Sequence, residues 1–148
     1  MTRRPFKLFV TALITTAVAG ATLSACGGED PYCAAVTEHQ KVLDSFGEKR
    51  TDAGFTAYGK AVTAIGAVAP KVVKEDWTTL AGVTTGVLKA QQKAGIPLED
   101  MTDPAKVEAL SSDDLKTLNS AYDAFNDTGA QRKAVVADVK TACDITLK

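Results

Sequence analysis

The sequence predicts an all-α protein, a single bundle of about five main helices with one further short helix. Apolar residues recur at intervals of three and four over most of the chain after residue 30, a period typical of amphipathic helices. The alternation of apolar and polar residues that indicates strands is missing from the pattern. Residues that begin or end helices separate these segments. The 148 residues are enough for one domain.

The first predicted helix begins at Asp30 and Pro31 and ends at Gly47. Aspartate is a favoured N-cap residue, and proline suits the first helical position because its missing N–H would have no intrahelical partner there. Glycine commonly follows the end of a helix. The apolar face of this helix is predicted to comprise Tyr32, Val36, Leu43 and Phe46.

The second and third predicted helices meet at Pro70, which stops the second helix and suits the first turn of the third. The second helix begins near Thr51, and the third ends at Gly95. The inward residues are predicted to be Phe55, Tyr58, Val62 and Ile65 in the second helix and Val73, Trp77, Leu80, Thr84 and Val87 in the third.

Two features of the third helix allow more than one interpretation. Trp77 is in step with the apolar stripe, so we expect it to pack in the core, with a wall of a ligand site as the alternative. Gly82 and Gly86 lie on the side of the helix away from that stripe. Each costs about 1 kcal/mol in a helix, so they either admit another backbone closely or are tolerated in a sequence rich in glycine and alanine.

A loop with two prolines follows at residues 95–104, and Asp103 with Pro104 begins a short helix that reaches about Leu110. Ser111, with Asp114 three residues later, then begins another main helix. The inward residues of that main helix are predicted to be Leu115, Leu118, Tyr122 and Phe125.

The sequence NDTG at residues 126–129 breaks that helix, and Thr128 and Gln131 have the spacing of a capping box for the last helix. The inward residues of the last helix are predicted to be Val136, Val139 and Cys143.

Residues 1–25 have the three-part layout of an export signal peptide. The segment MTRRPFK carries positive charge, an apolar run follows from Leu8 to about Leu23, and the small residues Ser24 and Ala25 end the segment. A permanent transmembrane helix is the alternative, but a span needs roughly 20 apolar residues, and this run has about 16. The start TRRPFK also resembles a twin-arginine export motif, although adjacent arginines are common in ordinary signals.

The residues LSAC at positions 23–26 resemble a bacterial lipobox, which is an aliphatic residue and two small residues before a cysteine. Leu23, Ser24, Ala25 and Cys26 match all four positions. The resemblance implies that a diacylglycerol is attached to the Cys26 sulfur and that the chain is cut before Cys26. The alternative is an ordinary signal peptide with an incidental cysteine.

Lipidation of Cys26 would leave Cys33 and Cys143 as an even pair. Disulfides persist in the oxidising compartments to which an exported protein goes, so we expect these two cysteines to form one. Two free thiols are the alternative. A zinc site is less favoured, because the chain has a single histidine and neither cysteine has a second one near it at zinc-ligand spacing.

The disulfide closes the predicted bundle and constrains its topology. Five helices that simply alternated in direction would place Cys33 and Cys143 at opposite ends, whereas a disulfide needs their Cα atoms within about 7 Å. We therefore expect residues 95–110, with their short helix, to be a crossover between two main helices that run parallel.

The domain organisation follows from these assignments. It comprises a signal peptide at 1–25, a lipidated tether at 26–30 and the helical bundle at 31–148. A diacylglycerol has two chains, which is enough for stable anchoring, so we expect an exported protein that is attached to the outer face of the cell membrane through Cys26. The tether reaches at most roughly 15–20 Å, so the end of the bundle that holds the disulfide should lie near the membrane.

Charge argues against a nucleic-acid partner. Without the three basic residues of the signal segment, 14 basic residues stand against 18 acidic residues, a net charge of −4. Nucleic-acid binding requires a basic face. The sequence therefore predicts a domain that does not bind nucleic acid.

No catalytic, metal or cofactor motif stands out in the sequence, and we expect a non-enzymatic protein without a cofactor. His39 is interpreted as a surface or boundary residue of the first helix. The acids Glu99, Asp100 and Asp103 lack the pattern of a calcium loop, so we interpret them as residues of a solvated loop and an N-cap. We interpret Asp113 and Asp114 as acidic residues of a first helical turn, where they interact favourably with the helix dipole.

As a whole, the chain resembles small actinobacterial lipoproteins of unassigned function. The resemblance rests on the lipobox, the all-helical mature domain, the APKVVKEDW segment at a helix junction and a cysteine close to the end. We expect an envelope lipoprotein that binds or scaffolds a protein partner. The alternative is a carrier or sensor of a small apolar ligand in a bundle cavity near Trp77, and an enzyme is a distant third.

Overall fold

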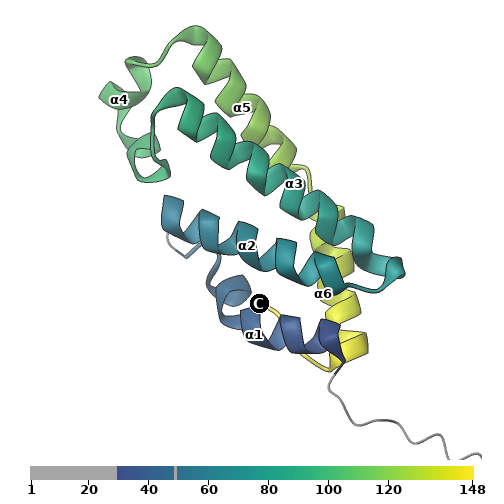
Figure 1. The fold of residues 1–148 in the computed structure, drawn as a ribbon. Coiled ribbons are helices and arrows are strands. Elements are labelled where there is room, and N and C mark those ends of the chain that lie inside the picture. Colours follow the sequence, from purple (N-terminus) through teal and green to yellow (C-terminus); the bar gives the residue numbers. More distant parts are fainter. Residues whose placement is uncertain (1–29, 49) are drawn as a thin grey trace, which may run out of the picture.

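The structure, a computed structural model, describes residues 30–48 and 50–148 as an all-helical bundle closed by a disulfide (Figure 1). The signal peptide, the lipobox and Cys26 lie outside these residues. The elements are α1 (Pro31–Ser45), α2 (Asp52–Val68), α3 (Lys71–Ala94), the 3-10 helix η1 (Leu98–Thr102), α4 (Pro104–Glu108), α5 (Ser112–Asn126) and α6 (Gly129–Cys143).

The helices begin where the capping residues predict. The Asp30 carboxylate accepts a hydrogen bond of 2.8 Å from the backbone N–H of Tyr32, and the Thr51 hydroxyl accepts one of 3.1 Å from Gly54. Ser111 and Asp114 cap α5 reciprocally, because the serine hydroxyl accepts from the Asp114 N–H and donates to its carboxylate. These side chains satisfy backbone N–H groups that have no partner within the helix.

The predicted start of the last helix differs in its details. Thr128 precedes α6, but its hydroxyl donates to the carbonyl of Phe125 at 2.7 Å and accepts no capping bond, so the capping box is wrong. Val136 is 38% exposed and Val135 only 4%. Spacings of three and four both describe a helix face, and packing against α3 selects Val135 with Val139 and Cys143.

The main core runs through the bundle, and every inward residue predicted for the third helix is buried. A smaller cluster of Ala90, Ile96 and Leu118 joins the end of α3 to α5. Trp77 is 1% exposed, and its indole Nε1 donates a hydrogen bond of 3.1 Å to the Tyr32 hydroxyl. That hydroxyl in turn donates to the carboxylate of Asp138 at 2.9 Å. The chain of bonds ties α3, α1 and α6 together beside the disulfide.

The disulfide joins Cys33, in the first turn of α1, to Cys143, the last residue of α6. Their Cα atoms are 5.3 Å apart, and 110 positions separate them in sequence. The sequence prediction of this pair is therefore confirmed. We call this part of the molecule, with Tyr32, Trp77 and the disulfide, the disulfide end.

The predicted parallel crossover is wrong, because α5 runs antiparallel to α3. Leu118, in the first half of α5, packs with Ala90 near the end of α3. Farther along the chain, Asp138 in α6 accepts from Tyr32, which also contacts Trp77 near the start of α3. Contacts along α5 and α6 thus proceed from the end of α3 towards its start, and Figure 1 shows the two helices following one another along it.

The topology is explained by the break at residues 126–129. This sequence bends the chain between α5 and α6 instead of reversing it, so the two helices form a single bent arm. Four arms then alternate in direction, and both cysteines fall at the same end without a crossover. Residues 95–110, with η1 and α4, form the turn between α3 and α5.

Close helix packing involves glycines of α2 and not those noted in α3. A Cβ atom on Gly66 would lie 3.2 Å from the Trp77 Cβ, and one on Gly59 would lie 3.2 Å from a methyl group of Thr84. A Cβ on Gly82 or Gly86 would have no neighbour within 4 Å in the part of the chain that the structure describes. The glycines of α2 therefore allow α3 to approach, while those of α3 face open space.

Candidate functional site

The candidate site is a cleft at the end of α1 and α2 opposite the disulfide, with a volume of about 360 Å³. We call it the aromatic cleft, and this part of the molecule the cleft end. It lies between the connection of α1 to α2, the η1 segment and the second half of α5. Its lining residues are Phe46, Gly47, Arg50, Phe55, Leu98, Tyr122, Phe125 and Asn126.

Aromatic rings from three segments form its apolar wall. Phe46, just after α1, stacks on Tyr58 of α2 with ring centroids 3.8 Å apart. Phe125 of α5 lies 5.0 Å from Phe55 and 5.9 Å from Phe46, at inclined angles. Such edge and stacked contacts hold the rings in place. Gly47, with φ of +96°, lets the chain turn away directly after Phe46.

A half-buried carboxylate fixes the opposite wall. Asp52, the first residue of α2, accepts a hydrogen bond of 2.8 Å from the Leu98 N–H and one of 3.2 Å from the Gln91 amide. The Asp52 N–H donates to Glu99 at 3.2 Å. These bonds attach the turn that follows α3 to the start of α2, and they hold Leu98 against the cleft.

The Tyr122 hydroxyl is the unusual polar group of the cleft. It is buried and has no hydrogen-bond partner among the described residues. Burial and, to a lesser extent, the negative charge of Asp52 raise the pKa of Tyr122 to about 12, so the phenol is neutral at physiological pH and can donate a hydrogen bond. Buried polar groups normally have a partner, and one without it requires an explanation, such as a water or a ligand.

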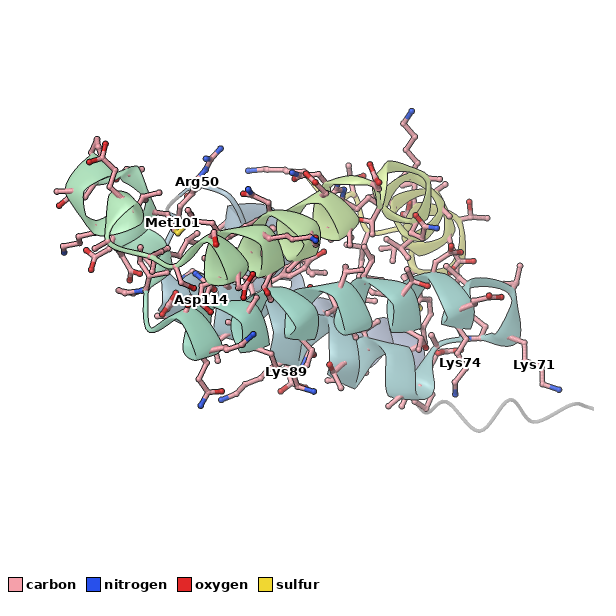
Figure 2. The ribbon with its side chains drawn as sticks, turned by 90° about the horizontal axis from the view of Figure 1, so that it is seen from above. Arg50, Lys71, Lys74, Lys89, Met101 and Asp114 are labelled. Carbon is pink, nitrogen blue, oxygen red and sulfur yellow. A yellow bond between two sulfur atoms is a disulfide. The ribbon has the colours of Figure 1, made fainter. Side chains whose placement is uncertain are left out.

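Arg50 supplies positive charge at the cleft. Among the described residues, it is the one charged side chain in the lining, and the two ion pairs found there, Lys106–Asp100 and Lys140–Asp144, do not involve it. Figure 2 shows Arg50 and Met101 at the end of the molecule opposite Lys71 and Lys74. The cleft thus combines aromatic walls, a buried neutral donor and an exposed guanidinium.

The residues singled out in the sequence lie away from this cleft. Trp77 is enclosed in the core at the disulfide end, and His39 is half-buried in the middle of α1. In the acidic loop, Asp103 caps α4 through a bond of 3.0 Å to the Ala105 N–H, as predicted. Asp100 pairs with Lys106 at 2.6 Å, and Glu99 accepts from Asp52.

Sequence reasoning identified the aromatic residues of the cleft but not the cleft. Phe46, Phe55, Tyr122 and Phe125 were each predicted to face inward, and each does. Their common feature is that all lie near a helix end, where side chains meet without a neighbouring turn to fill the space between them. Arg50 could not be recognised as a cleft residue from the sequence, because single arginines are common in the connections between helices.

The described residues contain neither a metal-ligand cluster nor a helix that could span a membrane. No group of three or more His, Cys, Asp or Glu side chains is arranged there to hold a metal ion. None of the helices in residues 30–48 and 50–148 combines the length and the apolar character needed to cross a bilayer.

Comparisons of the chain with family models, with curated proteins and with solved structures find no match. The functional argument therefore rests on the residues and on the geometry of the bundle.

Proposed function

We propose that the protein is an exported, lipid-anchored and non-enzymatic binding protein at the outer face of the cell membrane. The observation that carries this proposal is the lipobox at 23–26, which follows an export signal and directly precedes the bundle. Only Gly27 to Asp30 separate the proposed lipidated cysteine from α1. A diacylglycerol at that position would anchor the domain without a spanning helix.

The surface of the disulfide end supports this orientation. The chain enters the bundle there at Asp30, and the turn between α2 and α3 lies at the same end (Figure 1). Directly after that turn, the start of α3 carries Val72, which is 81% exposed, with Lys71 and Lys74 beside it (Figure 2). An exposed apolar side chain between lysines suits the boundary between lipid headgroups and acyl chains.

The aromatic cleft then faces away from the membrane. The 15 residues of α1 separate the two ends, a length of about 22 Å at 1.5 Å per residue. A filled core around Trp77 favours the binding of a partner over storage of a ligand inside the bundle. The cleft itself favours a second candidate, a carrier or sensor that takes a small apolar ligand at its surface.

Metabolic labelling with palmitate tests the anchor. The wild-type protein should incorporate label and sediment with membranes, and Cys26→Ala should do neither. The matched control is the double variant Cys33→Ser/Cys143→Ser, which loses two cysteines and should still be labelled. Label that persists in Cys26→Ala, or a wild-type protein without label, would overturn the proposal. Crosslinking in native membranes followed by mass spectrometry would then identify the bound partner.

A further inference from the structure

We propose that the aromatic cleft binds a small apolar carboxylate, with the hydrocarbon part between the rings and the carboxylate towards Tyr122 and Arg50. This inference deepens the proposed function and rests on its claim that the cleft end is the binding end. It names the chemistry of the ligand, which the sequence leaves open.

The apolar part of the ligand follows from the walls. Phe46, Phe55, Phe125 and Leu98 contribute three rings and one branched side chain to a volume of about 360 Å³. Pockets for small molecules range over roughly 300–1,000 Å³, so this one is at the small end. It suits a ligand with one or two rings or a short branched chain, and it is too small to enclose a long acyl chain.

The carboxylate follows from the two polar groups. The Tyr122 hydroxyl is buried without a partner among the described residues, so an acceptor that enters the cleft gains a hydrogen bond without displacing a partner among them. Arg50 contributes a guanidinium, whose planar fork matches a carboxylate. A ligand that satisfies both groups carries an anionic acceptor at one end of an apolar body.

Neighbouring acids do not convert the cleft into a cation site. The Asp52 carboxylate accepts from Leu98 and Gln91, and Glu99 accepts from the Asp52 N–H, so both acids are engaged in holding η1 to α2. Neither lines the cleft. A cationic ligand would instead meet Arg50, which disfavours the aromatic-cage chemistry that such rings can provide.

Titration calorimetry with two probes of the same shape tests the inference. The probes are 1-naphthoate and its neutral amide, 1-naphthamide, added to the mature lipoprotein in phosphatidylcholine nanodiscs, with empty nanodiscs as the blank. We expect the carboxylate to bind about tenfold more tightly than the amide, because hydrogen bonds to charged groups are stronger than those to neutral groups.

Two variants separate the contributions of the polar groups. Arg50→Gln should weaken 1-naphthoate about tenfold and leave 1-naphthamide nearly unchanged. Tyr122→Phe should weaken both probes by about fivefold, because both present an oxygen acceptor. The matched control is Lys89→Gln, which removes a charge from the exposed surface of α3, away from the cleft, and should bind both probes like the wild type.

The outcomes separate this inference from the proposed function. A folded wild type that binds neither probe, or binds both equally, overturns the carboxylate inference, while palmitate labelling still decides the anchor independently. If neither probe binds but crosslinks from the cleft residues capture an envelope protein, the cleft is a protein-docking surface and the inference is wrong. Equal losses in Arg50→Gln and Lys89→Gln would likewise contradict it.

Discussion

The two ends of the bundle differ in whether their buried polar groups have hydrogen-bond partners. At the disulfide end, Trp77, Tyr32 and Asp138 form a chain of hydrogen bonds in which each donor has an acceptor. At the cleft end, the Tyr122 hydroxyl is buried and has no partner among the described residues. An unsatisfied buried group costs free energy, so this comparison suggests that the first end is built for stability and the second for binding.

Removal of the disulfide should have the largest effect and would show how far the disulfide end stabilises the whole domain. The double variant Cys33→Ser/Cys143→Ser should lose about 2–5 kcal/mol of unfolding free energy, because the unfolded chain is no longer closed across 110 positions. Urea titration followed by the fluorescence of Trp77 measures the loss. An unchanged midpoint would mean that the disulfide contributes little to the stability of this end.

A pair of glycine substitutions tests the tight packing beside Trp77. Gly66→Leu should destabilise the protein by roughly 1–3 kcal/mol, because its Cβ would lie 3.2 Å from the Trp77 Cβ in a closed helix interface. Gly82→Leu, the control in an open position, should gain up to about 1 kcal/mol of helix propensity. Thermal unfolding followed by circular dichroism compares them. Changes of the same sign would contradict the assigned packing.

The most direct test makes the same change at both ends. Tyr32→Phe should lose about 1–3 kcal/mol, because it leaves the Trp77 N–H and the Asp138 carboxylate without their partner. Tyr122→Phe should gain about 1 kcal/mol without ligand, since it removes a buried hydroxyl that has no bond among the described residues. Chemical denaturation of both variants measures the difference. Equal losses would remove the contrast between the ends.

Much of the fold could be predicted from local signals. Asp30, Thr51 and Ser111 cap helices through hydrogen bonds to residues two or three positions later. Such short-range bonds can be recognised from a few neighbouring residues of the sequence. The inward face of α3 was also predictable, because its mostly apolar stripe recurs at steps of three and four from Val73 to Val87. The face of α6 was not, since Val135 and Val136 fit a helical stripe equally well and only the neighbouring helices distinguish them.

The site was less predictable than the fold, because its residues come from separate segments. Phe46, Phe55, Leu98 and Tyr122 could each be assigned to a helix or loop, yet nothing in their spacing shows that they enclose a volume. The bonds from Leu98 and Gln91 to Asp52 join residues almost forty or more positions apart. Contacts of that range depend on how the helices pack.

Local signals predict the helices and most of their caps, and the assignment of Cys26 to the lipobox leaves Cys33 and Cys143 to pair. Long-range packing, which no local signal reports, makes the break at residues 126–129 bend the chain instead of reversing it, so that α5 is antiparallel to α3. The angle of a helix break depends on the surfaces that it brings together. The same packing decides that one end of the bundle is closed around Trp77 and the other is open at Tyr122.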